Sequence, residues 1–213
     1  MFQPVIKWSG SKRSQAKDII SYFPKEIGTY YEPFCGGASI LRALLDSDIK
    51  VDHYVASDLN KDLIDLFLAI KNRPNEVYEH LTRSGINLQT LKKIIFEWSD
   101  LLNKNNVEFK CCSFEEIKPN KNDFMYLDPP YANTKGMYFC GFDNKKLFAW
   151  LKVVKCRWIM SYNGISGKED NTFSVPKELY DEHVYLKSGN SSFKRTIGKD
   201  KNAMVYESLY IKN

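Results

Sequence analysis

Short apolar runs rich in strand-forming residues alternate along this chain with segments of helical periodicity. Alternation of this kind is typical of βαβ units, in which helices cover a sheet of parallel strands. The strand-like runs lie at residues 30–31, 54–56, 107–111, 124–127 and 158–162, and the helical patterns lie at 41–45, 63–70 and 147–153. The sequence therefore predicts an α/β fold with a doubly wound, mostly parallel sheet rather than a β-sandwich.

The C-terminal region predicts a β-hairpin with a long basic tip. Two runs of strand-forming residues, 182–186 and 203–211, flank a segment rich in Ser, Gly, Lys and Asn and bring the expected strands to seven. The tip carries Lys194, Arg195, Lys199 and Lys201. These charges suit contacts to nucleic-acid phosphates, which need positive charge but little precision, and a solvated hairpin tip explains them equally well.

Residues 73–104 differ from the rest because no strand-like run interrupts them. Their apolar residues recur at helical spacing: Leu88, Leu91, Ile94, Ile95, Trp98, Leu101 and Leu102. We expect a short helical insert here, with residues 1–72 and 105–213 forming the main domain. Trp98 is expected in the core, since Trp is highly buried on average.

The composition narrows the class of protein. A chain of 213 residues suits one domain with a small insert, and a net charge of +5 is compatible with a polyanionic partner. Five Cys without a C-x-x-C pair and three scattered His support neither a metal site nor a disulfide framework. We expect a cytoplasmic protein without a membrane partner, because no secretory leader or long apolar stretch is present.

The apolar run at 124–127 ends on Asp128, Pro129, Pro130 and Tyr131. Proline cannot donate to a sheet ladder, so the strand must end there. The carbonyls of Asp128 and Pro129 would then lie beside a carboxylate and an aromatic ring at the carboxyl end of a strand, where open α/β sheets bind ligands. The structural alternative is a rigid loop with a capping Asp.

A glycine turn follows the first expected strand. After Glu32, the residues Pro33, Phe34, Cys35, Gly36 and Gly37 lead into a helix expected to open at Ala38. Adjacent glycines allow a ligand to approach the backbone closely. Phosphate binding is not the expected task of this turn, because it has neither G-x-G-x-x-G nor a Walker lysine.

Two further stretches are suited to bind a nucleoside beside this glycine turn. Asp58 ends the second strand, and an acid at that position after a glycine-rich loop typically accepts hydrogen bonds from a ribose diol. An N-cap for the helix starting near Asn60 is the structural alternative for Asp58. At the N-terminus, Trp8 and Lys12 flank a small-residue turn and suit packing on the same ligand, with Lys12 meeting a carboxylate or another negatively charged group. A flexible basic terminus is the alternative.

Taken together and in this order, the four stretches resemble the Dam-type DNA adenine methyltransferases. The K-W-x-G-x-K pattern of that family is matched by Lys7, Trp8, Gly10 and Lys12, and its acid at the end of strand two by Asp58. Its E-P-F-x-G-x-G/A-S pattern is matched by Glu32, Pro33, Phe34, Gly36, Ala38 and Ser39, and its catalytic D-P-P-Y by residues 128–131.

The resemblance implies a Rossmann-like class I methyltransferase fold with a seven-stranded sheet. It implies site-specific methyl transfer from S-adenosyl-L-methionine to the exocyclic amino group of adenine in double-stranded DNA, leaving S-adenosyl-L-homocysteine and needing no metal. The expected setting is restriction-modification or other phage or bacterial DNA modification. The expected cofactor-binding residues are Lys7, Trp8, Ser9, Gly10, Lys12, Glu32, Pro33, Phe34, Gly36, Ser39, Asp58, Leu59 and Asp128.

By the same resemblance, Asp128 and the Pro129 carbonyl would each accept one proton of the amino group, and Tyr131 would stack on the adenine. One departure concerns residues 73–104, which lack the N-G-x-x-R-x-N type stretch of the family's target-recognition segment. The alternatives are a truncated relative that binds the methyl donor or DNA, and amino methylation of RNA or protein.

Overall fold

The structure, a computed structural model, describes residues 2–82, 88–130, 142–190 and 204–213. The chain divides into two compact units, Met1–Ile117 and Lys118–Asn213, which are described separately.

The first unit contains three parallel strands in the order β3-β2-β1. Glu32 pairs with Ala56 and Asp58 pairs with Cys111, so the carboxyl ends of the three strands lie at one edge. The loops that follow these ends are therefore brought together by the sheet itself. The strands are β1 (Glu26–Glu32), β2 (Lys50–Asp58) and β3 (Val107–Cys111).

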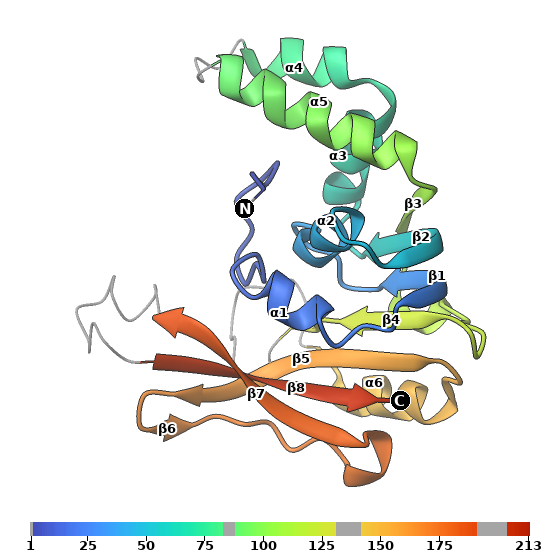
Figure 1. Cartoon of the computed structure of the whole chain (residues 1–213), viewed down its shortest axis with the longest axis vertical. Coiled ribbons are helices and arrows are strands. Elements are labelled where there is room, and N and C mark those ends of the chain that lie inside the picture. The colour runs from blue at the N-terminus through green and yellow to red at the C-terminus, as the bar shows by residue number, and fades with distance from the viewer. Residues whose placement is uncertain (1, 83–87, 131–141, 191–203) are drawn as a thin grey trace. The chain divides into compact units, whose positions relative to one another are not determined.

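In the described residues of this unit, five α-helices accompany the sheet, and Figure 1 shows two of them, α4 and α5, lying alongside each other. The helix α4 directly precedes α5 among the described elements, and residues 74–82 and 88–104 contain no strand. Trp98 of α5 is 1% exposed, which confirms its expected core position, and its ring packs on Phe67 of α3. The helices are α1 (Ala16–Ile20), α2 (Ser39–Leu45), α3 (Lys61–Asn72), α4 (Pro74–Thr82) and α5 (Leu88–Lys104).

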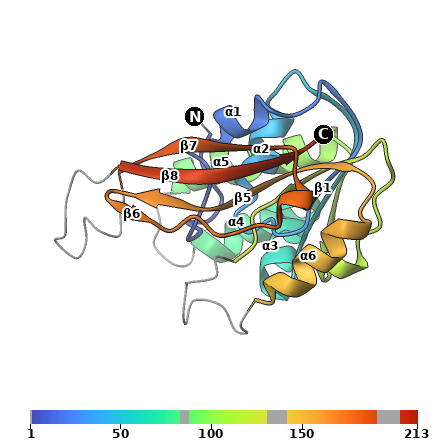
Figure 2. The same cartoon turned by 90° about the horizontal axis from the view of Figure 1, so that it is seen from below.

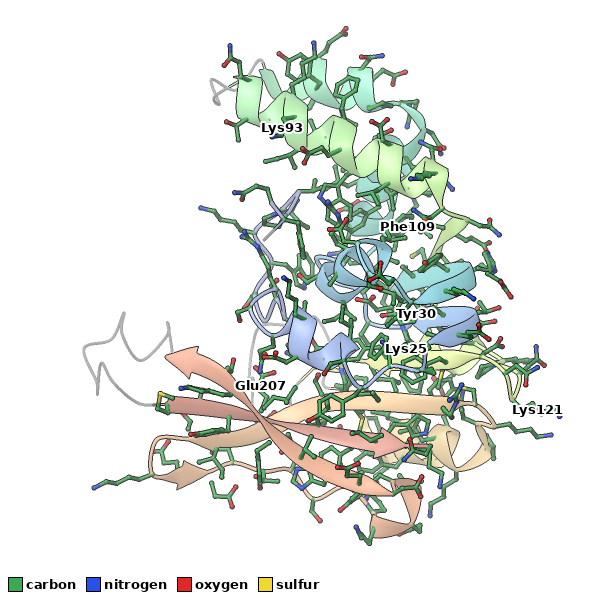
Figure 3. The ribbon with its side chains drawn as sticks, in the orientation of Figure 1. Lys25, Tyr30, Lys93, Phe109, Lys121 and Glu207 are labelled. Carbon is green, nitrogen blue, oxygen red and sulfur yellow. The ribbon has the colours of Figure 1, made fainter. Side chains whose placement is uncertain are left out.

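Aromatic side chains fill the core of this unit (Figure 3). Phe109 of β3 stacks on Phe67 with ring centroids 4.9 Å apart. Tyr30 of β1 is fully buried against Phe23 and Tyr54, and its hydroxyl donates to Glu32 at 2.7 Å. The buried tyrosine thereby fixes the carboxylate with which β1 ends.

The second unit contains a mixed sheet in the order β4-β5-β8-β7, and Figure 2 shows β5, β8 and β7 side by side with β6 next to β5. β4 is parallel to β5, and β8 is antiparallel to both β5 and β7, so β4, β5 and β7 share one direction. The elements are β4 (Phe124–Leu127), α6 (Asn144–Val153), β5 (Arg157–Ser166), β6 (Glu169–Asp170), β7 (Glu182–Asn190) and β8 (Met204–Lys212).

The expected α/β class with mostly parallel strands is confirmed. Six of the seven expected strand runs lie in strands, as do residues 204–211 of the seventh, and the antiparallel pairing of β7 with β8 confirms the C-terminal hairpin. The two-residue β6 and the short α1 were not expected. Within the described ranges, no helix combines the length and apolar character needed to cross a bilayer.

Candidate functional site

The turn after β1 is shaped by the close approach of Trp8. Gly36 has a φ of +46°, and a Cβ at that position would lie 2.6 Å from Nε1 of the Trp8 indole. A Cβ at Gly37 would lie 2.9 Å from Cβ of Trp8. The adjacent glycines were expected to let a ligand approach the backbone, and in the structure the indole is the group that makes this approach.

The exit from the turn is slightly later than expected. Ala38 adopts a left-handed conformation with φ of +52° and serves as the N-cap of α2, which begins at Ser39 rather than at Ala38. The Cys35 amide donates to the Ser57 carbonyl of β2 at 2.9 Å. This bond attaches the turn to the neighbouring strand, so the turn and the end of β2 form one rigid edge.

Asp58 connects the turn to the loop that follows its own strand. Its Oδ2 accepts a hydrogen bond from the Gly36 amide at 3.1 Å, and its Oδ1 accepts one from the Asn60 amide at 2.9 Å. The alternative role of Asp58 as a helix N-cap is wrong, because Asn60 caps α3 by accepting from the Leu63 amide. A carboxylate has about four lone-pair sites, so Asp58 retains capacity to accept further hydrogen bonds.

The N-terminal segment is docked on this turn. Ser11 Oγ and Ser39 Oγ share a hydrogen bond of 2.7 Å, and the Ser11 amide donates to the Trp8 carbonyl at 3.3 Å. Lys12 is 4% exposed, and its ammonium donates to the Gly10 carbonyl at 3.2 Å. These contacts contradict the alternative of a frayed terminus for residues 8–12. Lys7, Ser9 and Gly10 are exposed.

The edge carries buried negative charge. Glu32 is 2% exposed, and Asp58 is half-buried. Burial, followed by the charges of Glu32 and Asp58, raises the pKa of the Cys35 thiol well above its usual value, so this thiol stays neutral at physiological pH. Negative charge at such an edge favours a ligand with cationic groups.

An aromatic pair lies at the same edge and was only half expected. Phe114, 8% exposed, packs against Phe34 with ring centroids 5.6 Å apart. It opens the 3₁₀-helix Phe114–Glu116, whose capping box joins Ser113 and Glu116. Phe114 was not predicted to lie in the site, although the S-x-x-E spacing after a predicted strand could have identified it. Leu59, expected in the site, is 73% exposed beside Asp58.

The D-P-P stretch lies in the second unit, at the end of β4. All four residues of β4 are buried, and its parallel register with β5 ends at the pair Leu127 and Met160, which confirms the expected strand end. Asp128 and Pro130 are half-buried and Pro129 is buried. Upstream, a hydrogen bond between Tyr126 Oη and Ser161 Oγ joins β4 to β5.

Five expected site residues lie outside the described ranges. They are Tyr131, Lys194, Arg195, Lys199 and Lys201. Within the described part of the chain, no group of three or more His, Cys, Asp or Glu is arranged to hold a metal ion.

Comparison with protein families gives a match over most of the chain. Residues 8–96 and 86–149 match the family described as D12 class N6 adenine-specific DNA methyltransferase. The two matched segments overlap at residues 86–96, a range that includes the start of α5. The match therefore includes the N-terminal segment, the glycine turn, Asp58 and the D-P-P-Y stretch.

The individual relatives share about a quarter of their aligned residues with this chain. A type II methyltransferase, M.CviBI of Paramecium bursaria Chlorella virus NC1A, is 24% identical over 269 aligned residues that cover 99% of each chain. That alignment is longer than this chain of 213 residues, so the relative has residues without a counterpart here. The DNA adenine methylase of Escherichia coli K12 is 27% identical over 49% of this chain and 36% of its own length.

A solved structure supports the fold. The rRNA methyltransferase aviRa from Streptomyces viridochromogenes superposes with a TM-score of 0.54 over 100% of this chain and 85% of its own, at 12% identity. The chain therefore has the fold of the methyltransferases that it was expected to resemble.

Proposed function

Because this chain belongs to the D12 class of N6 adenine-specific DNA methyltransferases, we propose that it uses S-adenosyl-L-methionine to methylate the exocyclic amino group of adenine in double-stranded DNA. The observation that carries the proposal is the turn held between Trp8 and Asp58, at the carboxyl edge where α/β sheets bind nucleotides. A role in restriction-modification is consistent with the type II relatives.

The first unit supplies groups that fit the methyl donor. Asp58 is suited to accept from the ribose hydroxyls, and the pair Phe34 and Phe114 offers an apolar surface to the adenine ring of the donor. The negative charge of Glu32 and Asp58 suits the positive sulfonium and ammonium groups. We place Lys12 near the donor carboxylate, and the other residues of the proposed set are Lys7, Trp8, Ser9, Gly10, Pro33, Gly36, Ser39 and Leu59.

The donor supplies an electrophilic methyl group, and the protein must activate a poor nucleophile. The lone pair of an amine conjugated to a purine ring is delocalised, and two acceptors set at tetrahedral directions around the nitrogen localise it. We assign these acceptors to the Asp128 carboxylate and the Pro129 carbonyl at the end of β4. The rigid prolines fix both acceptors before the substrate arrives, so less reorganisation is needed during transfer.

The target adenine is inaccessible inside a duplex and must be flipped out, at a cost of a few kcal/mol that is recovered in the pocket. Stacking on Tyr131 would supply part of that recovery. Lys194, Arg195, Lys199 and Lys201 would hold phosphates, since phosphate contacts position the duplex without specifying sequence. These residues are assigned by resemblance and charge alone.

We also propose that residues 73–104 form a short insert in place of a target-recognition segment, within a methyltransferase domain made of residues 1–72 and 105–213. Two observations support this. The family match is split into two segments that overlap at residues 86–96, and the alignment with the viral relative is longer than this chain.

The proposed function is tested by transfer of a tritium-labelled methyl group to unmethylated genomic DNA, with RNA and peptide as parallel substrates. We expect label in DNA, as N6-methyladenine after digestion. Asp128→Ala should lower the rate of methyl transfer by at least about 100-fold. An acceptor at this strand end contributes more to stabilising the transition state than to stabilising the folded core.

Circular dichroism and thermal unfolding of the variant serve as the control for folding. Label in RNA or peptide alone, or none in any substrate, would reject the proposal. An Asp128→Ala variant as active as the wild type would leave Asp128 as a structural cap only.

A further inference from the structure

Phe2 and Gln3 are anchored on α5, far from them in sequence. Trp98 Nε1 donates a hydrogen bond to the Gln3 carbonyl at 3.1 Å. The Phe2 ring meets the Trp98 ring edge-on, with centroids 6.5 Å apart and an interplanar angle of 81°. Figure 1 shows the N-terminal segment extending from α1 past α2 toward α5. A hydrogen bond to the Gln3 backbone and a ring contact with Phe2 thus hold two adjacent residues on the same Trp98 side chain.

Two guanidinium groups complete this anchor. Arg42 of α2 lies 5.4 Å from the centroid of Phe2 and 5.5 Å from that of Trp98, and Arg13 lies 5.7 Å from Phe2. Arg42 is 7% exposed and forms an ion pair with Asp46 at 3.2 Å. Cation–π contacts of a partly desolvated guanidinium are stronger than exposed ones. The Phe2 ring therefore joins α5 to α2, the helix that follows the glycine turn.

The other end of the segment is fixed on the glycine turn itself. Trp8 covers Gly36 and Gly37 so closely that a Cβ on either would collide with it, and Ser11 is bonded to Ser39. Only residues 4–7 separate Gln3 from Trp8. Since so short a connection allows little slack, the anchor on α5 restricts where Trp8 can lie.

We propose that Phe2 and Trp98 are positioning residues for donor binding. They act through the N-terminal segment by holding Trp8 and Lys12 against the turn before the donor binds. Without the anchor, ordering this segment would cost conformational entropy at the moment of binding and weaken affinity. The inference rests on the proposed function, and it gives α5 a part in donor binding that the family patterns in residues 7–131 do not assign to it.

The experiment measures binding of S-adenosyl-L-homocysteine to the full-length chain by calorimetry. Trp98→Phe retains an aromatic ring but removes the N–H that donates to Gln3, and Phe2→Ala removes the ring between the two arginines. We expect Kd to rise about tenfold for Phe2→Ala and less for Trp98→Phe, a tenfold change being about 1.4 kcal/mol. In turnover assays KM for the donor should rise while kcat stays near the wild-type value.

Ser99→Ala is the matched control. Ser99 is the buried neighbour of Trp98 on α5, and its hydroxyl donates to the Lys71 carbonyl of α3 at 3.3 Å. This variant loses that bond and the one that Ser99 Oγ accepts from Asn103 Nδ2 at 3.4 Å, and neither bond reaches the N-terminal segment. It should bind the donor like the wild type. Cleavage by trypsin after Lys7 should be faster in Phe2→Ala and Trp98→Phe than in the control. Phe2→Tyr, which keeps the aromatic ring, should bind the donor with an affinity close to that of the wild type.

The outcomes separate the two proposals. Absence of binding by the wild type would reject the proposed function. Binding by the wild type with unchanged affinity in Phe2→Ala would overturn the positioning role, as would an equal loss in Ser99→Ala. If Trp98→Phe fails to fold, Phe2→Ala decides alone, since Phe2 is a half-buried residue near the chain start.

Discussion

At the scale of single residues, two glycines with positive φ separate backbone strain from steric contact. The backbone conformations of Gly36 (φ +46°) and Gly10 (φ +77°) are both ones that favour glycine. A Cβ added at Gly36 would collide with the Trp8 indole, whereas one added at Gly10 would meet nothing within 4 Å. We expect Gly10→Ala to destabilise the protein by about 1 kcal/mol through strain, and Gly36→Ala to cost about 2 kcal/mol or more because Trp8 must also move.

Denaturant unfolding of the two variants measures this difference directly. We also expect Gly36→Ala to lower the affinity for the donor by more than the backbone strain measured in Gly10→Ala would account for. Equal stabilities of the two variants would show that Trp8 does not restrict the turn.

Asp58 carries the second prediction at this scale. Its carboxylate already accepts from the Gly36 and Asn60 amides, and we assign it the donor ribose as well. Asp58→Ala should therefore weaken binding of S-adenosyl-L-homocysteine by about 1 to 3 kcal/mol, as for other hydrogen bonds to charged groups. Asp58→Asn, which retains one acceptor oxygen, is the control and should lose less. Wild-type affinity in Asp58→Ala would show that the carboxylate serves only the turn.

At the scale of elements, the C-terminal hairpin contains a histidine that is kept neutral. His183 of β7 stacks on Tyr210 of β8 with centroids 4.4 Å apart and lies 4.8 Å from the Tyr185 ring. Burial, followed by the charge of Lys177, lowers the pKa of His183 below its usual 6.5. The cluster also includes Tyr180, whose ring lies 4.4 Å from the Lys177 ammonium.

The sign of the pH effect follows from linkage. Below its usual pKa, His183 binds a proton in the unfolded chain before it does so in the folded chain, so acidification favours unfolding. The contribution to stability is complete above the usual pKa and is lost as pH falls toward the lowered value. The urea concentration at the unfolding midpoint of the wild type should therefore fall as the pH is lowered from about 7.5 to about 5.5.

His183→Phe is the control, because it retains an aromatic ring in the stack but cannot titrate. Its urea midpoint should vary less over the same range. The carboxyls of Glu178 and Asp181 have lowered pKa values and act at a lower pH, below their usual 4.5 and 3.8. An equal pH dependence in the variant would assign the effect to other groups.

At the scale of the whole molecule, the short stretch at 73–104 limits what DNA binding can achieve. The apolar residues of α5 are used in packing, since Ile95, Trp98 and Leu102 are buried. Sequence readout needs side chains that reach base edges in the major groove. We therefore expect weak DNA binding with little sequence discrimination, dominated by phosphate contacts.

If about four phosphates are neutralised, a fourfold rise in salt should weaken binding on the order of 100-fold. The measurement is affinity for several unmethylated duplexes at two salt concentrations, with sequencing of the methylated sites. A strong preference for one short motif at physiological salt would show that α4 and α5, or the hairpin, recognise bases.

Some of the fold and site could be predicted from local patterns alone. The bounds of β3 and β4 agree with the predicted runs, because Gly, Pro and polar residues end strands through the backbone itself. The five-residue α1 was missed, since so short a helix has too few turns to show a period. Asp58 was considered as the N-cap of α3, and only the observed hydrogen bonds show that Asn60 is the cap instead.

Periodicity and short motifs are enough to predict the family, the order of strands and helices along the chain, and the types of residue at each strand end. The folded structure is needed to show that Trp8 covers the glycine turn, that Asp58 bonds to Gly36, and that Phe2 and Gln3 rest on Trp98. The hydrogen bond between Gly36 and Asp58 joins residues that are 22 positions apart in the chain, and the one between Trp98 and Gln3 joins residues that are 95 positions apart. No local pattern encodes such pairs, since each depends on how helices and loops pack once the sheet has formed.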